Sequence, residues 1–284
     1  MIPLDFDYAR PASVDEALGL LAKPGAVALA GGQSLLPMLA DRSVSAGLVV
    51  DIGRLPDLKR IDVADGLLTI GAAVTLTAAM CSKVSEAAPL LSEAILSVGS
   101  AAVRNRGTLV GNLVRASPNS ELPSAVVALG ATLALTSLDG ERTLAAEDFF
   151  LGAHETALAP GELVTALRIP TASPNASVSA FGEISSRAGA PPLCCVAVDL
   201  RLDGTDIVAA RIVAGGLANR PLRCSAFEAA LFGSVSAVST TLKADVALPD
   251  SSDGPAADYA RDVLPVLIRR TVARAVAKIE GSAA

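Results

Sequence analysis

The 284-residue sequence contains no tryptophan, a single histidine and four cysteines. A Ser-His-Asp triad would have to use His154, which lies in GAHETALAP, a segment that we expect to be an exposed loop. Cys81, Cys194, Cys195 and Cys224 lack the C-x-x-C spacing of zinc or iron–sulfur sites, so we expect no metal site in this chain. The segment PLCCVAVDL predicts a buried strand in which both cysteines are small apolar side chains.

Long uncharged apolar runs are also missing. A membrane-spanning helix needs roughly 20 mostly apolar residues, and the best candidates, GLLTIGAAVTLTAAMCS and LPSAVVALGATLALTSL, are shorter and read as two elements each. The start of the sequence has no basic stretch followed by an apolar core, so we expect no signal peptide, no membrane insertion and a cytoplasmic location. Scattered Lys and Arg, a net charge of −6 and a pI near 4.9 argue against nucleic-acid binding.

What the chain has is an excess of aliphatic residues. Its mean hydropathy is +0.51, which is high for a protein without a membrane span. Obligate interfaces resemble a domain core cut in half, so this excess favours a subunit of an assembly. The length is comfortable for two domains.

The first 55 residues predict a small βαβ unit. SVDEALGLLAK has Ser13 as an N-cap and Glu16 three residues later, which is a capping box. AVALA (26–30) and GLVVDIGRL (47–55) read as strands on either side of a short helix, SLLPMLADR, which we expect to break near Pro37. This spacing indicates a parallel pair of strands.

The middle of the chain mixes strands and helices. LLTIGAAVTL predicts strand, turn and strand, and VSEAAPLLSEAILSVGS predicts a helix with Ala87, Leu90, Leu91 and Ala94 on one face. RNRGTLVGNLVRASPNSELP has little periodicity and is expected to be a long functional loop. SAVVALGA then predicts a helix, and TLALTSL, ERTLAAEDFF and GELVTALRIP predict strands.

Beyond a polar stretch at 171–177, the candidate domain boundary, the pattern changes. VSAFGEISSR, LCCVAVDLRLDG and DIVAARIVAGGL predict an antiparallel sheet of about three strands. AFEAALFG and YARDVLPVLIRRTVARAVAKIEG predict helices.

Two glycine segments carry the candidate chemistry. AGGQS (30–34) lies between a strand and a helix, and GTLVGN (107–112) is a second segment of similar character. Glycine permits positive φ and close backbone approach, and N–H groups at helix N-termini bind phosphate. Neither segment matches G-x-G-x-x-G or a Walker A loop, so plain turns and a pyrophosphate clasp both remain open. Glu121 is placed to accept a ribose hydroxyl, to stabilise a helix N-terminus, or to do both.

Taken in order along the chain, these segments resemble the medium, flavin-binding subunit of the molybdenum hydroxylases, a family that includes aerobic carbon monoxide dehydrogenase and the flavin portion of xanthine dehydrogenase. The resemblance rests on AGGQSLLPML, VVDIGRLPDL, IGAAVT, VRNRGTLVGNLVRASPNSELP, FFLG with TALAPGELVTALRIP, and ARIVAGGLANRPLR. It implies an α+β fold. An FAD-binding domain over 1–172, like that of vanillyl-alcohol oxidase and PCMH, has subdomains of about 1–55 and 56–172. A smaller C-terminal domain of antiparallel sheet plus helices covers 173–284.

The resemblance also implies the residues that bind FAD, with the two glycine segments on its pyrophosphate. The matching positions are Leu29, Ala30, Gly31, Gly32, Gln33, Ser34, Leu35, Thr108, Leu109, Val110, Gly111, Asn112, Glu121 and Val164. Three of them depart from the family pattern. Gln33 replaces a usual His, Val110 replaces a Gly of TIGGN, and Glu121 replaces an Asp. If position 110 needs a positive φ, its β-branched side chain is strained there.

A further departure lies in the C-terminal part. After SAF, family members often have a basic or aromatic stretch, whereas this chain has GEISSRAGAPPL, with Glu183, Arg187 and Pro191. Contacts to the isoalloxazine ring are therefore not carried over from the family.

As a function, the resemblance implies an FAD-carrying electron-transfer subunit of a three-component molybdenum hydroxylase, which is an oxidoreductase. A small subunit would hold 2Fe-2S clusters, and a large subunit with the molybdenum cofactor would hydroxylate a small, heterocyclic substrate with oxygen from water. The acceptor would be NAD, a quinone or O2, and the assembly a dimer of heterotrimers. Because the cofactor carries the redox chemistry, no catalytic acid or base is assigned.

Two alternatives stand beside this hypothesis. One is a self-contained flavoprotein oxidoreductase, which would need its own substrate pocket and an acid or base near the flavin. The other is a non-enzymatic scaffold subunit that has lost FAD, motivated by Val110.

Overall fold

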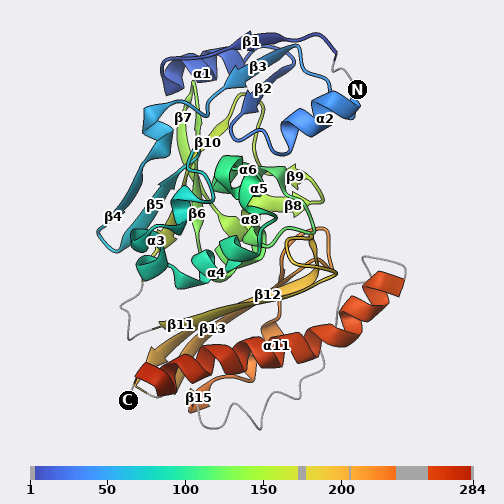
Figure 1. The fold of residues 1–284 in the computed structure, drawn as a ribbon. Helices are drawn as coiled ribbons and strands as arrows, with labels where there is room; N and C mark the ends of the chain where they lie inside the picture. The colour runs from blue at the N-terminus through green and yellow to red at the C-terminus, as the bar shows by residue number, and fades with distance from the viewer. Residues whose placement is uncertain (1–3, 172–176, 205, 235–254, 283–284) are drawn as a thin grey trace.

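The structure, a computed structural model, describes residues 4–171, 177–204, 206–234 and 255–282. Figure 1 shows three sheets following one another along the molecule, with α11 at the far end. The proposed boundary at 171–177 lies almost wholly outside the described residues. None of the helices in the described ranges is long and apolar enough to cross a membrane.

The first sheet is a small parallel one in the order β1-β3-β2. It contains the predicted parallel pair and one more strand, β1, that the sequence pattern did not reveal. Its elements are β1 (Asp7–Ala9), α1 (Val14–Leu21), β2 (Ala26–Leu29), α2 (Leu35–Asp41) and β3 (Leu48–Asp51).

The capping box at the start of α1 is present in a modified form. Ser13 Oγ accepts the Glu16 N–H at 3.1 Å, while the Glu16 carboxylate accepts the N–H of Ala12 at 2.7 Å. The expected break of α2 at Pro37 is wrong. Pro37 lies in the first turn, where backbone N–H groups have no intrahelical partner to lose.

The second sheet is antiparallel, in the order β4-β5-β10-β6-β7. Its strands are β4 (Ile61–Ala64), β5 (Leu67–Gly71), β6 (Thr132–Ser137), β7 (Gly140–Ala145) and β10 (Leu163–Pro170). The second strand predicted within LLTIGAAVTL does not form. After β5 the chain leaves the sheet, and Thr75 makes only an isolated bridge with Thr108.

Short helices cover this sheet (Figure 1). They are η1 (Pro56–Lys59), η2 (Ala78–Met80), α3 (Ser82–Ala87), α4 (Pro89–Ser97), α5 (Ala101–Arg106), α6 (Leu109–Arg115), α7 (Leu122–Ala128) and α8 (Ala146–Phe149), with a two-stranded ribbon of β8 (Phe150–Gly152) and β9 (Glu155–Thr156).

Two helical predictions need correction. The single helix predicted for VSEAAPLLSEAILSVGS is two helices, α3 and α4, because Pro89 disfavours a helical conformation at Ala88. Leu90, Leu91 and Ala94 are buried as predicted, whereas Ala87 is only half-buried. The long loop predicted over 104–123 instead contains the end of α5, all of α6 and the start of α7.

The C-terminal sheet confirms the three predicted antiparallel strands and adds two short ones. It comprises β11 (Ser177–Ser185), β12 (Pro192–Asp203), β13 (Asp206–Gly215), β14 (Leu222–Arg223) and β15 (Gly233–Ser234), with α9 (Ser225–Ala229) and α11 (Pro255–Ser282).

Alternation along these strands gives the sheet two buried faces. Phe181, Cys195, Ala197 and Val213 join the core of the first 170 residues. The opposite face packs under α11, where Cys194 is buried with Val196 and Ile268, among others. The prediction that both adjacent cysteines are buried in a strand is confirmed.

Glu93 on α4 connects the first core to the C-terminal sheet. Its carboxylate accepts the Phe181 backbone N–H at 2.9 Å and lies 2.5 Å from Lys278 Nζ and 3.5 Å from Arg274 Nη2. Arg274 Nη1 also donates to Phe181 O at 3.0 Å, and Lys278 Nζ donates to Ser179 O at 2.5 Å. One carboxylate therefore holds α4, β11 and α11 in a fixed arrangement.

Replacing Glu93 with Ala leaves the Phe181 N–H without its acceptor. We expect the free energy of unfolding to fall by about 1–3 kcal/mol, the cost of an unsatisfied buried group, as measured by urea denaturation. The matched control is Glu86→Ala on the exposed face of α3, which should change stability by less than about 0.5 kcal/mol. Equal losses in the two variants would contradict a connecting role for Glu93.

Candidate functional site

The first glycine segment links β2 to α2 through a left-handed residue. Gly32 has φ 75°, a conformation that glycine adopts without steric cost. The carbonyls of Gly32 and Ser34 accept N–H groups of α2, from Leu36 and Met38. The N–H groups of Gly31, Gly32, Gln33 and Ser34 make no hydrogen bond to any residue that the structure describes. Four adjacent donors are thus left available.

The second segment is a helix start rather than a glycine loop, which corrects the expectation for GTLVGN. Gly107 follows α5, and Thr108 is the N-cap of α6, its Oγ1 accepting the Gly111 N–H at 3.2 Å. The Leu109 N–H donates to Val74 O at 3.1 Å. Val110 lies in the first turn of α6, is 2 % exposed and has no positive φ. The condition for strain at Val110 is therefore not met.

The two segments meet backbone to backbone. A Cβ on Gly31 would lie 2.2 Å from Arg106 O and 2.8 Å from Gly107 Cα. A Cβ on Gly107 would lie 3.5 Å from Gln33 Cγ. These distances leave no room for a side chain at Gly31. They also show that the residues preceding the N-termini of α2 and α6 lie against each other.

Asn112 extends this region toward α7. Its Oδ1 accepts a hydrogen bond from Ser120 Oγ at 2.7 Å, and Ser120 itself is buried. The next residue, Glu121, is 4 % exposed at the N-cap position of α7, yet its side chain makes no capping bond. The pKa of Glu121 is raised to about 7, chiefly by burial and to a smaller extent by the Glu183 carboxylate, while a hydrogen bond from its own backbone N–H lowers it.

The other predicted residues surround these groups to different extents. Leu29 and Leu35 flank the first segment as the last residue of β2 and the first of α2. Leu109, the first residue of α6, is fully buried. Val164 is also buried, on β10 beside a bulge, and β10 packs against α6. Gly107 and Ser120 belong to the same arrangement. Gly107 opens the predicted segment GTLVGN but was not among the residues matched to FAD binding, and nothing in the sequence singled out Ser120.

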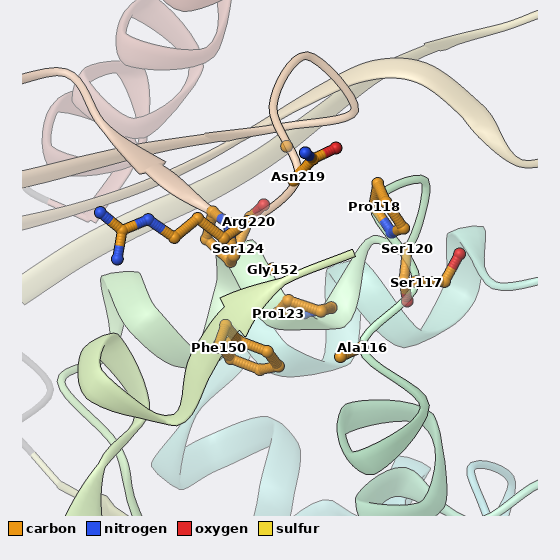
Figure 2. Close-up of a pocket in the computed structure, with 12 residues that line it drawn as sticks. Ala116, Ser117, Pro118, Ser120, Pro123, Ser124, Phe150, Gly152, Asn219 and Arg220 are labelled. Atoms are coloured by element: carbon orange, nitrogen blue, oxygen red, sulfur yellow. The ribbon is translucent and has the colours of Figure 1, made fainter. Parts of the chain in front are cut away.

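A shallow pocket lies beside this region, where the loop after α6 faces the loop after β13 (Figure 2). Ser117, Ser120 and Pro123 line it on one side and Asn219 and Pro221 on the other. In Figure 2 the Arg220 guanidinium extends away from Ser117 and Ser120. The pocket shares only Ser120 with the groups above and contains no residue of the first glycine segment.

His154 has a structural contact rather than a catalytic one. Its backbone N–H donates to Ala116 O at 2.8 Å, and its Nδ1 lies 3.1 Å from Arg115 O. His154 therefore contacts carbonyl groups at the C-terminal end of α6. Among the described residues, no group of three or more His, Cys, Asp and Glu side chains could hold a metal ion.

Comparison with known proteins matches both halves of the fold. The model of the FAD binding domain in molybdopterin dehydrogenase matches residues 4–172, and that of the CO dehydrogenase flavoprotein C-terminal domain matches residues 179–275. The chain belongs to the FAD-binding medium subunits of the molybdenum hydroxylases. This medium subunit has the α+β fold expected from the sequence.

Relatives match over nearly the full length. The carbon monoxide dehydrogenase medium chain of Afipia carboxidovorans is 35 % identical, covering 98 % of this chain and 99 % of its own. The caffeine dehydrogenase subunit beta of a Pseudomonas species is 38 % identical, covering 87 % and 84 %. The structure of quinoline 2-oxidoreductase from Pseudomonas putida has a TM-score of 0.90 at 32 % identity, covering 98 % and 99 %. All three are similar oxidoreductases that differ in substrate.

The contact at Gly31 gives a direct prediction. Gly31→Ala places a methyl group where Arg106 O lies at 2.2 Å, so the two segments must separate. We expect a loss of about 1–3 kcal/mol in unfolding free energy, typical of overpacking, together with reduced FAD content. Gly19→Ala is the matched control, because its Cβ would meet nothing within 4 Å on the exposed side of α1. It should stabilise the protein by about 0.5–1 kcal/mol.

The buried Glu121 carboxyl predicts a pH dependence of stability. Its pKa rises from 4.5 to about 7 on folding, so the folded chain keeps a proton that the unfolded chain has lost. The free energy of unfolding of FAD-free protein should therefore fall between about pH 4.5 and pH 7, by roughly 3 kcal/mol from this group. Asp199, with a pKa of about 6, adds a change of the same sign.

Glu121→Gln isolates the contribution of this carboxyl. The variant should match the natural protein at about pH 4 and exceed its unfolding free energy at about pH 8, as measured by urea titration at each pH. Parallel pH profiles for the two proteins would show that Glu121 titrates normally.

Proposed function

We propose that this medium subunit carries FAD as the electron-transfer component of a three-component molybdenum hydroxylase. It receives electrons from 2Fe-2S clusters on a small subunit and passes them to NAD, a quinone or O2. A large molybdenum-cofactor subunit hydroxylates a small, heterocyclic substrate, in a cytoplasmic dimer of heterotrimers. Residues 1–172, with subdomains of about 1–55 and 56–172, form the FAD-binding domain, and residues 173–284 form the C-terminal domain.

The single observation that carries the proposal is the meeting of the two glycine segments. Four unbonded N–H groups at Gly31–Ser34 lie where α2 begins, against the start of α6. Backbone donors at helix N-termini suit a pyrophosphate and need no Lys or Arg, which agrees with the net charge of −6. FAD, when bound, supplies one- and two-electron redox chemistry.

Each proposed residue has a distinct role toward the cofactor. The Ala30–Ser34 backbone donates to the pyrophosphate, and Leu29 and Leu35 fix the ends of that segment. The first turn of α6 forms the other side of this pyrophosphate cradle. Gly111 lies in that turn and, lacking a Cβ, leaves the space beside it open. The polar side chains of Asn112 and Glu121 bind parts of FAD other than the pyrophosphate. The buried side chains of Leu109 and Val110 anchor the first turn of α6 in the core, and Val164 lies on β10, which packs against α6.

Neither alternative has a specific observation in its favour. The scaffold hypothesis was motivated by strain at Val110, and Val110 lies in an ordinary helical turn. A self-contained oxidoreductase would need its own substrate pocket with an acid or base residue near the flavin. The pocket at Ser120 holds Ser117 and Ser124 but no carboxylate, His or Lys.

The visible spectrum and the copurifying proteins test this function. The purified chain should be yellow or become so on adding FAD, and in its host it should copurify with a molybdenum subunit and an iron–sulfur subunit. A chain that cannot be reconstituted with FAD would refute the assignment. Turnover of a small substrate by the yellow chain alone would refute the role of an electron-transfer subunit.

Two glycine variants test the pyrophosphate cradle. Gly32→Val forces a β-branched residue to φ 75°, and Gly111→Val brings a Cβ to 2.5 Å from Thr108 Oγ1. Each should abolish FAD retention, measured by absorbance of the purified protein, while circular dichroism stays near that of the natural protein. Gly66→Val is the control, since Gly66 has a similar φ of 73° in the β4–β5 turn with nothing within 4 Å. Its flavin content should be normal.

A further inference from the structure

Glu183 projects from β11 toward the first core. Side chains alternate along a strand, and a Cβ on the neighbouring Gly182 would lie 2.4 Å from Thr271 Oγ1 of α11. Gly182 therefore faces α11. Phe181, on the other face, belongs to the core of the first 170 residues. Glu183 shares the face of Phe181, so its carboxyl points away from α11 and into the junction between the two parts of the chain.

Glu121 reaches the same junction from α7. Glu183 is paired in register with Cys195, and Cys195 with Gly215. The start of α7 packs on this row, because Cys195 Sγ lies 3.7 Å from Ser124 Oγ, and a Cβ on Gly215 would lie 2.4 Å from that same hydroxyl. Ser124 is one helical turn after Glu121. The two carboxyl groups thus face each other across the junction.

One carboxylate oxygen at this junction, Oε2 of Glu183, has no hydrogen-bond partner among the described residues. Glu183 Oε1 accepts a bond from Ser185 Oγ at 3.4 Å, but Oε2 is buried and has no partner among the described residues. Glu121, 4 % exposed, makes no side-chain capping bond. No described Arg or Lys forms an ion pair with either group. Burial raises the pKa of both carboxyls, although the hydroxyls of Ser185 and Ser97 lower that of Glu183 and the backbone N–H of Glu121 lowers its own.

A buried acceptor without a donor is costly, by about 1–3 kcal/mol, and such groups in folded proteins need an explanation. The position of this one supplies it. Asn112, next to Gly111 of the second segment, accepts a hydrogen bond from Ser120, the residue before Glu121. The Glu121 carboxyl in turn interacts electrostatically with Glu183. FAD offers hydroxyl groups on both sides of its pyrophosphate and an imide N–H on its ring, which are donors that a carboxylate accepts.

We propose that Glu183 is a second carboxylate of the FAD site, contributed by the C-terminal sheet, whose Oε2 accepts a hydrogen bond from a hydroxyl or ring N–H of the cofactor. The inference rests on the proposed function. It assigns a cofactor contact to a residue outside the segments that carry the family resemblance. It also gives the C-terminal sheet a part in cofactor binding, held in place by the bond between Glu93 and Phe181 N–H two residues away.

The test is FAD titration of the full-length flavin-free protein, followed by flavin fluorescence, for the natural chain and for Glu183→Ala. We expect the Kd for FAD to rise by about 5- to 100-fold, the loss of one bond from a buried acceptor. The melting temperature of the flavin-free variant should stay equal or rise, because a buried unpaired carboxyl is removed. Glu183→Gln keeps an acceptor oxygen, so its Kd for FAD should lie between those of the natural chain and Glu183→Ala. It replaces the Ala variant in the test if that variant does not fold.

Control and half-ligand measurements make the result specific. Glu147→Gln removes another carboxylate between the two parts of the chain, 3.8 Å from Arg223, and should leave the Kd for FAD unchanged. FMN and ADP serve as the two half-ligands. A weakened Kd for FMN alone places Glu183 beside the riboflavin half, and one for ADP alone places it beside the adenosine half.

An unchanged Kd for FAD in the folded Glu183 variants would overturn the inference. If the melting temperature of the flavin-free variant then also falls, Glu183 is a purely structural residue. A natural chain that binds no FAD would instead refute the proposed function itself, and the inference with it.

Discussion

The fold depends on one close backbone contact, between Gly31 and the Arg106–Gly107 peptide. Roughly 75 residues separate the two segments, and only the absence of a side chain lets them touch. On one side, the parallel pair of β2 and β3 fixes where the first segment leaves the sheet. On the other, α5 ends and α6 begins within two residues. The elements that fix the position of both segments therefore all lie within the first 115 residues.

The C-terminal sheet adds a different constraint, because it is buried on both faces. Phe181, Cys195, Ala197 and Val213 complete the core of the preceding part, while α11 covers the other side. Hydrogen bonds and ion pairs then fix the orientation of the sheet relative to that core. Glu93 holds β11, and Arg223 links Glu147 of α8 to the buried Glu228 beside β13. A sheet placed in this way can present a side chain such as Glu183 at a defined position.

Local signals in the sequence were sufficient for much of the fold. The Ser13 cap, the strand–helix–strand spacing of the first 55 residues and the alternation of the last three long strands are patterns within one element or between consecutive elements. The structure confirms them. The stretch 104–123 was mistaken for a loop because α5 and α6 are only 6 and 7 residues long, too short to show helical periodicity. The meeting of Gly31 with Arg106, and of Glu121 with Glu183, depends on tertiary packing and has no local signature.

The start of α6 also bears on how freely this sequence can change. The proposed cradle of backbone N–H groups requires residues without a Cβ at Gly31 and Gly111, where a Cβ would lie 2.2 and 2.5 Å from its nearest neighbours. Gln33 and Val110 are then substitutions of low consequence, since one packs along Gly107 and the other lies buried in a regular helical turn. In the proposed cradle, the contacts that fix the two segments are therefore main-chain contacts.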